Sequence, residues 1–284
     1  MILPMGGSMI KKSSFISKNA KPIKRTRARI FLGKCFYTFR RYAQWYITGK
    51  KYCKLIEKNV YPNVYFEHKT PLIRKLKDVD MWLQYNKIKN IKIAIKKING
   101  IIIKPGETFS YWRLIGKPTA KKGYTEGMIL FYGGFKAGVG GGLCQLSNLI
   151  YWITLHTPLK VVERYRHSYD VFPDSNRTQP FGSGATCVYN YRDLQIYNGT
   201  EEAFQLTVYI DGEYLVGKWL TINEGKLKYE VYEKDHYMKQ EFWGGYSRNN
   251  ILHRKIFSRN GEFLKDEYLT ENHAIMMYEP FLGE

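Results

Sequence analysis

One cysteine stands at the junction between a glycine-rich run and an apolar stretch, in YGGFKAGVGGGLCQLSNLIYW over residues 132–152. If the apolar stretch is a helix, Cys144 lies in its first turn, where unpaired backbone N–H groups and the helix dipole favour the thiolate. The glycines before it allow a sharp turn and a close approach of the backbone to a ligand. Backbone N–H groups of Gly142, Leu143 or Cys144 could then stabilise an oxyanion, and the Gln145 side chain is a further donor. The stretch predicts a nucleophilic thiol; the alternative is a glycine-rich turn around an inert, buried thiol.

A base for this thiol is available in ERYRHS, where His167 follows a predicted strand in a loop that can face the start of the helix. A cysteine at a helix start with a histidine after a later strand is a recurring arrangement in thiol acyl-transfer enzymes. His156 stands at the predicted end of the same helix, where capping explains it. Asp193, Asn198 and Asp170 are candidates to orient His167. Asp193 and Asn198 also fit turns between strands, and for Asp193 we favour that structural interpretation.

Charged and aromatic side chains near these residues are candidates to bind a substrate. Arg164 and Arg166 could hold a carboxylate, because guanidinium groups match carboxylates with paired hydrogen bonds. As strand-end residues they are equally explained as solvated side chains. Glu107 precedes an aromatic cluster that includes Trp112, and this cluster lines either a cleft or a core.

The other cysteines, Cys35, Cys53 and Cys187, have no short paired spacing with each other or with Cys144. This distribution argues against a structural zinc site and against a small disulfide scaffold. Their apolar or aromatic neighbours predict small, buried hydrophobic residues. We expect neither a metal nor a cofactor.

Positive charge is concentrated at the start of the chain. The net charge of +20 belongs entirely to the first hundred residues, and Glu57 is the only acidic residue among residues 1–60. Lysine and arginine alternate there with aromatic residues, a pattern that suits an anionic membrane surface or an anionic polymer. A solvated basic face in a chain of biased composition is the competing interpretation. Nucleic-acid binding is less favoured, because no zinc-finger, helix-turn-helix or RNA-binding signature accompanies the charge.

Periodicity predicts the elements that position the candidate residues. Isoleucines at helical spacing predict a helix that stops at Asn99-Gly100 and leads into a strand over 101–103. Leucines and isoleucines after Cys144 predict a second helix, which Thr157-Pro158 closes. The remainder predicts mostly antiparallel strands, at 159–163, 186–189, 194–197, 204–210, 214–220, 226–233 and 251–258.

These elements predict an α+β fold, with helices of the N-terminal part packed on a mostly antiparallel sheet and a catalytic-type cysteine at a helix N-terminus. We expect a basic, aromatic-rich segment over 1–78, a central domain over 79–220 and a β-rich extension over 221–284. The short apolar start is followed by lysines, which is not the order of a secretory signal, and no run is long enough to span a bilayer. The sequence therefore predicts a cytoplasmic or peripherally membrane-associated protein.

Four ordered segments resemble the VanW family, which is named for an accessory protein of glycopeptide-resistance clusters: GETFSYWRLIGKPTAKKGYTEGMILFYGG, GVGGGLCQLSNLIYW, LHTPLKVVERYRHS and YRDLQIYN. The resemblance covers about residues 80–220. Some proteins with this domain act as L,D-transpeptidases that join peptidoglycan stems through the family's cysteine. The resemblance therefore implies that Cys144 is the nucleophile and His167 its partner. The family usually has an acidic residue where this chain has Gly184, so another group must orient the histidine or full activity is lacking.

The resemblance implies acyl transfer on peptidoglycan stem peptides or their precursors, through a thioester on Cys144, and it also allows a location at the cell wall. The alternative is a non-catalytic accessory or binding protein for cell-wall precursors or anionic lipid, in which residues 1–60 contact a membrane surface. The sequence leaves the donor, the acceptor and the oligomeric state open.

Overall fold

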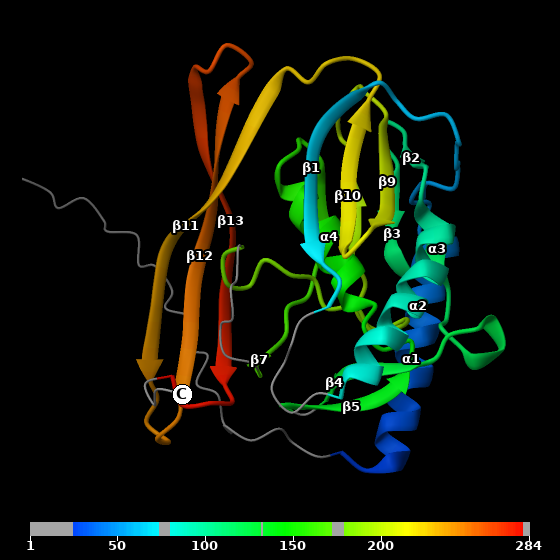
Figure 1. The fold of residues 1–284 in the computed structure, drawn as a ribbon, viewed down its shortest axis with the longest axis vertical. Helices are drawn as coiled ribbons and strands as arrows, with labels where there is room; N and C mark the ends of the chain where they lie inside the picture. Colours follow the sequence, from blue (N-terminus) through cyan, green and yellow to red (C-terminus); the bar gives the residue numbers. More distant parts are fainter. Residues whose placement is uncertain (1–24, 74–79, 132, 172–178, 281–284) are drawn as a thin grey trace, which may run out of the picture.

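The computed structural model describes residues 25–73, 80–131, 133–171 and 179–280. It is an α+β protein whose sheets are mostly antiparallel, as the sequence predicts. Helix α4 lies between two four-stranded sheets, one central and one C-terminal (Figure 1). The helices are α1 (Arg27–Tyr46), α2 (Met81–Ile98), α3 (Tyr111–Ile115), the short 3-10 helix η1 (Ala120–Lys122) and α4 (Cys144–Leu155).

The strands of the described ranges form four sheets. The central sheet is antiparallel with the order β1 (Asn63–Pro71), β10 (Tyr214–Thr221), β9 (Phe204–Asp211), β2 (Ile101–Ile103). The C-terminal sheet has the order β11 (Leu227–Gln240), β12 (Tyr246–Ser258), β13 (Phe263–Met276), β7 (Tyr169–Asp170), and only β7 runs parallel to its neighbour. A small sheet has the order β3 (Thr108–Ser110), β8 (Gln195–Tyr197), β6 (Lys160–Glu163), and a hairpin joins β4 (Glu126–Phe131) to β5 (Gly134–Val139).

The apolar residues after Cys144 make α4 the centre of the core. Leu146, Leu149, Ile150 and Ile153 are almost completely buried. The helix packs on β10 and β1, and Gly217 of β10 permits the close approach, because a Cβ there would lie 3.0 Å from the Leu149 side chain. Burial of these side chains fixes α4, and with it the residues at its first turn.

Most predicted elements are confirmed. Helix α2 ends before Asn99-Gly100 and leads into β2, and the β9–β10 hairpin turns at Asp211-Gly212. The strand predicted over 186–189 is wrong. Val188 instead pairs with Arg192 across a tight turn in which Asn190 has a φ of 57°, so this segment is a loop.

The segments at either end are tied into the rest of the fold. Strand β1 lies within residues 1–78 yet pairs along its length with β10, and β13 of the C-terminal sheet pairs with β7. The boundaries at residues 78 and 220 stay predictions, while the strand pairing crosses both of them. No helix in the described ranges is long and apolar enough to cross a bilayer.

Candidate functional site

An open cleft of about 810 Å³ lies at the start of α4. Its lining comes from the β4–β5 hairpin, the glycine turn before α4, residues around β7, the loops near 182 and 188, and two residues of β13, Asn272 and Ala274. Cys144 and His167 both line this cleft. The fold therefore brings together two residues that lie 23 positions apart in the sequence.

Helix α4 begins at Cys144, and the glycine turn before it is held tightly in place. The backbone N–H of Gly142 donates to the Met128 carbonyl at 3.0 Å, and Asn90 Nδ2 donates to the Gly141 carbonyl at 2.9 Å. A Cβ on Gly141 would lie 2.1 Å from the carbonyl carbon of Gly127, so only glycine permits this contact between the turn and β4. These contacts hold Cys144 in its position in the lining of the cleft.

The electrostatics of the thiol differ from our expectation. Burial raises the pKa of Cys144 above its ordinary value, while hydrogen bonds from its own N–H and from the N–H of Cys187 act in the opposite direction. The prediction of a stabilised thiolate is therefore wrong, because loss of water outweighs the favourable helix terminus. At neutral pH the group is a thiol, and a nucleophilic role requires a base.

His167 has the properties of a neutral base. Burial, together with the positive charges of Arg192 and Arg164, lowers the pKa of His167 to about 4. The imidazole is therefore uncharged at pH 7 and can accept a proton. Among the described residues no hydrogen bond joins the Cys144 and His167 side chains, although both line the same cleft.

The candidate oxyanion donors have different surroundings. The Gly142 N–H is committed to Met128, which corrects the expectation that it faces a ligand. Gln145 lines the cleft, but its Nε2 donates to the Pro71 carbonyl at 2.7 Å and so ties α4 to the end of β1. The Leu143 N–H makes no hydrogen bond within the described part of the chain and stays a candidate donor.

Asp193, Asn198 and Glu107 do not line the cleft. The Asp193 carboxylate is completely buried and accepts hydrogen bonds from Ser110 Oγ at 2.5 Å and Trp112 N at 3.0 Å; burial raises its pKa to about 6. Asn198 Nδ2 donates to the carbonyls of Ile103 and Glu202, and Glu107 accepts from the backbone of Lys104. These hydrogen bonds indicate that the three side chains stabilise the fold. Within the described part of the chain, none of them is hydrogen bonded to His167.

The two predicted arginines separate into different roles. Arg164 donates to the Gly184 carbonyl at 2.9 Å and to Asn272 Oδ1 at 3.0 Å, and its guanidinium lies over the Tyr151 ring. It therefore joins a cleft loop to β13. Arg166 lines the cleft, and its Nη1 is buried without a hydrogen-bond partner. Burial, followed by the charge of Arg164, lowers the pKa of Arg166.

Sequence reasoning missed Arg192 as a cleft residue. Its Nε is buried without a hydrogen-bond partner, and its carbonyl accepts from Trp112 Nε1 at 3.0 Å. Trp112 also lines the cleft, as one of the two interpretations of its aromatic cluster predicts. The charged residues of the lining are Lys87, Lys117, Arg166, Arg192 and one acid, Asp170. This balance favours an anionic ligand.

Asn148 is the second residue that sequence reasoning missed. It follows Cys144 by four residues, so both lie on the same face of α4 and line the cleft. Asn148 Oδ1 accepts from the Ala185 N–H at 2.8 Å, and a Cβ on Gly184 would lie 2.8 Å from the same oxygen. The Asn148 amide therefore occupies the space beside Gly184. The four-residue spacing from the cysteine was the available signal.

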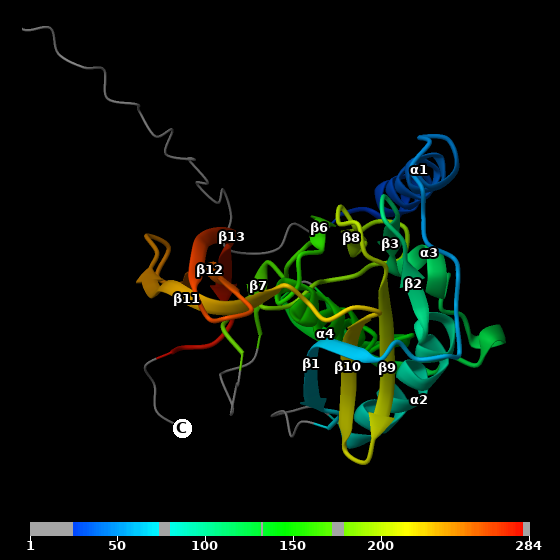
Figure 2. The ribbon, with the colours of Figure 1, turned by 90° about the horizontal axis from the view of Figure 1, so that it is seen from above.

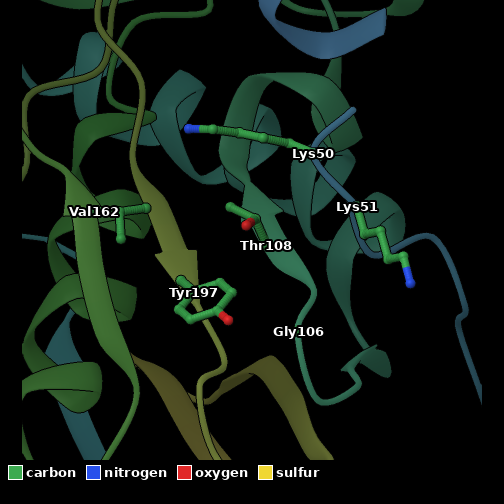
Figure 3. Close-up of a pocket in the computed structure, with 6 residues that line it drawn as sticks. All are labelled: Lys50, Lys51, Gly106, Thr108, Val162 and Tyr197. Atoms are coloured by element: carbon green, nitrogen blue, oxygen red, sulfur yellow. The ribbon is translucent and has the colours of Figure 1, made fainter. Parts of the chain in front are cut away.

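A second, much smaller cavity of about 160 Å³ does not compete with this cleft. Lys50, Lys51, Gly106, Thr108, Val162 and Tyr197 line it, and none of them lines the cleft. Lys50 reaches across the cavity, while Lys51 points away from it (Figure 3). The two ammonium groups do not converge on one ligand.

Comparisons with known proteins agree with the motifs. A family profile described as "VanW like protein" matches residues 86–220. The chain is 31% identical over 244 residues to the "Vancomycin B-type resistance protein VanW" of Enterococcus faecalis (strain ATCC 700802 / V583), covering 86% of this chain and 87% of that protein. It is 32% identical over 163 residues to the "Uncharacterized protein YoaR" of Bacillus subtilis (strain 168), covering 55% of this chain and 52% of that protein. No solved structure matches the chain at a significant level.

Proposed function

Because this chain belongs to the VanW family, we propose that it serves vancomycin resistance as a cysteine-dependent acyl-transfer enzyme acting on peptides of the cell wall. One observation carries the catalytic part of the proposal. A thiol at the first residue of a helix shares a solvent-accessible cleft with an imidazole whose pKa, lowered to about 4, keeps it neutral at pH 7. A protonated thiol and a neutral imidazole are the starting states for general-base catalysis.

The reaction proceeds in two acyl-transfer steps. Rotation of the side chains brings His167 to the thiol, and the imidazole takes the proton as the sulfur attacks an amide carbonyl carbon. The Leu143 N–H stabilises the oxyanion. The C–N bond then breaks, the imidazolium returns its proton to the leaving amine, and the acyl group stays on Cys144 as a thioester. An acceptor amine or water then attacks the thioester carbon while His167 takes its proton. The C–S bond breaks, and the imidazolium returns the proton to the departing sulfur, which restores the Cys144 thiol and the neutral imidazole.

The charge of the cleft supports an anionic peptide as substrate. Arg166 and Arg192 each contribute a buried guanidinium nitrogen without a protein hydrogen bond, and a carboxylate would satisfy both. Stem peptides of peptidoglycan, or their precursors, carry several carboxylates. Substrate binding by these two arginines would hold the peptide in the cleft that Cys144 lines.

The direct test is intact-protein mass spectrometry after incubation with purified muropeptides. We expect an acyl adduct that maps to Cys144 and is absent from Cys144→Ala. The matched control is Cys35→Ala, which should leave the adduct unchanged. Cys35 is exposed on α1, so the prediction that it is buried is wrong, whereas Cys53 and Cys187 are buried as predicted. Absence of both adduct and product, under conditions where the protein binds the muropeptide, would end the catalytic proposal.

The second candidate function is a non-catalytic binding protein for cell-wall precursors. The raised pKa of Cys144 and the absence of an acid hydrogen bonded to His167 in the described chain favour it. Calorimetric titration with muropeptides separates the two. A binding protein keeps its affinity in Cys144→Ala and loses it in Arg166→Gln or Arg192→Gln, with no product formed by the unaltered chain.

A further inference from the structure

Helix α1 packs on the rest of the protein through the side that carries Arg41 and Trp45, and at its C-terminal end the Arg113 guanidinium lies over the Tyr46 ring. Arg41 and Trp45 are its only buried residues. Arg41 forms an ion pair with Glu163, Trp45 Nε1 donates to Ser110 Oγ at 3.1 Å, and the Tyr42 and Tyr189 hydroxyls lie 3.1 Å apart. These contacts hold α1 firmly in place, at the side of the molecule opposite the C-terminal sheet (Figure 2).

The opposite face of α1 is apolar and exposed. Residues 32, 36, 39, 43 and 46 follow one another at intervals of three or four, so their side chains form one stripe along the helix. We call this set the α1 stripe; it consists of Leu32, Phe36, Phe39, Ala43 and Tyr46. Leu32 is 65% exposed, Phe39 74% and Tyr46 67%. A helix that buries its polar Arg41 and exposes phenylalanines has the reverse of the usual pattern for a surface helix of a globular protein.

Basic residues border the stripe, and α1 contains no acidic residue. Arg29 and Arg40 are eleven residues apart and so lie on the same side of the helix, next to the stripe, whereas Arg27 and Lys34 lie by helical spacing on the side of Arg41 and Trp45. None of these four forms an ion pair within the described chain. Apolar and aromatic side chains flanked by unpaired cations complement the interface of a membrane that carries anionic lipids.

We propose that α1 docks on an anionic membrane surface, with the α1 stripe inserted among the lipids and the arginines at the headgroups. A second copy of the chain is a poorer occupant, because the two basic faces would repel each other. A nucleic acid would pair with the arginines but would leave the phenylalanines exposed to water. The proposal does not depend on the activity of Cys144.

Docking would also place the cleft beside the membrane. Tyr189, which contacts Tyr42 of α1, lines the cleft, and the Tyr37 and Tyr191 rings lie 4.5 Å apart between centroids. One wall of the cleft is thus built directly on the docking helix. An anionic substrate anchored in the same membrane would meet the cleft without release from the lipid.

Co-sedimentation of the full chain with vesicles tests the proposal. We expect binding to vesicles of phosphatidylcholine and phosphatidylglycerol, and weak binding to phosphatidylcholine alone. Phe36→Glu with Phe39→Glu should lower the partition coefficient by at least about tenfold, because it replaces two apolar rings of the α1 stripe with carboxylates, which anionic headgroups repel. The matched control is Phe242→Glu, at a side chain 83% exposed in the β11–β12 turn, which should bind like the unaltered protein.

A second pair of variants tests the charge contribution. Arg29→Gln with Arg40→Gln should lower binding to the anionic vesicles by about tenfold or more and reduce its salt dependence. A fluorophore on Cys35, which is exposed on α1, should shift to the blue on binding. Equal sedimentation of all variants overturns the proposal. So does a dimer in sedimentation velocity that the phenylalanine variants dissociate, if the protein binds no vesicles.

Discussion

At the scale of single residues, the cleft pairs a thiol that resists ionisation with an imidazole that resists protonation. Burial causes both shifts, since a site with little water disfavours whichever form is charged. Such a pair is inert until a proton moves from one group to the other. The site is therefore better described as a general-base pair than as a preformed thiolate.

The first prediction concerns the pH profile of Cys144 alkylation. Because burial raises the pKa of Cys144, its reaction with iodoacetamide should reach half its maximal rate above the value of about 8.5 typical of a free cysteine. Peptide mass spectrometry after timed labelling measures the rate at this residue, with the exposed Cys35 as the reference in the same sample. If alkylation of Cys144 reached half its maximal rate below pH 8, the conclusion that burial raises the pKa of this thiol would be wrong.

The second prediction concerns acid stability. His156 and His167 both have folded pKa values of about 4, against about 6.5 in the unfolded chain, so the unfolded state binds more protons below pH 6.5. Each histidine should thus remove about 2 kcal/mol of stability between pH 7 and pH 5. Urea unfolding at both pH values measures the loss. In His167→Gln the loss of unfolding free energy between pH 7 and pH 5 should be smaller by about that amount. The same loss in the variant and the unaltered protein would contradict a buried, neutral imidazole at position 167.

Residue types and spacing predicted the cysteine and the histidine of the cleft but not their protonation. A helix start is visible in the sequence, whereas the burial that raises the pKa of Cys144 depends on the complete fold. Asp193 looked like a possible orienting acid only because nothing in the sequence indicates its buried bond to Ser110. Arg192 belongs to the segment YRDLQIYN, but nothing in the sequence distinguishes it from an arginine exposed in a turn.

At the scale of elements, the glycine turn controls where α4 begins. Gly141→Ala should destabilise the protein by about 3 kcal/mol or more, because its Cβ would meet backbone atoms of Gly127 that cannot move independently of β4. Thermal or urea denaturation measures the cost. The control is Gly49→Ala, where no atom lies within 4 Å and the expected cost of about 1 kcal/mol comes only from the left-handed φ of 71°, which Gly141 does not share. Equal costs would exclude the close contact as the cause.

The attachment of α1 provides the next prediction. Arg41 and Glu163 form a largely buried ion pair close to the Asp193 backbone. Arg41→Met alone should cost about 3–5 kcal/mol, because it leaves a buried carboxylate without its cation. The double variant with Glu163→Met should cost less than this single variant, since neither charge is then buried alone. Additive costs in this double-mutant cycle would show that the two side chains do not interact.

Elements with a clear period were predicted well, and those defined by tertiary contacts were not. The isoleucine spacing of α2 and the Asp-Gly turn between β9 and β10 are local signals. The segment 186–189 has strand-forming residues, but Thr186 donates to the Tyr165 carbonyl and Val188 turns back to Arg192. The sequence analysis did not predict helix α1, because most of its apolar residues face solvent and do not form the buried apolar face that usually identifies a helix.

At the scale of the whole molecule, the C-terminal sheet is a wall of the cleft and not an appendage. Asn272 and Ala274 of β13 line the cleft, and Arg164 links Asn272 to the loop that contains Gly184. The family profile ends at residue 220, so these contacts come from outside the matched region. No sequence signal placed β13 next to residues more than 80 positions earlier.

The final prediction tests this coupling at Asn250 of β12, which is completely buried. Its Nδ2 donates to the Phe181 carbonyl at 2.6 Å and to Glu233 Oε1 at 2.5 Å, and its Oδ1 accepts from Asn272 Nδ2 at 2.9 Å, so Asn250→Ala removes three buried or partly buried hydrogen bonds. We expect a loss of about 2–4 kcal/mol. Hydrogen exchange should also become faster in residues 179–187, most of which line the cleft.

The control for this prediction is Asn223→Ala, which removes an exposed asparagine that donates to Glu202 at 3.0 Å and should change stability by less than about 0.5 kcal/mol. If Asn250→Ala destabilises the C-terminal sheet while exchange in residues 179–187 stays unchanged, the sheet does not support the cleft. If exchange rises in both regions, the cleft depends on strands outside the matched family region. Specificity would then differ between relatives whose chains differ after the position of residue 220.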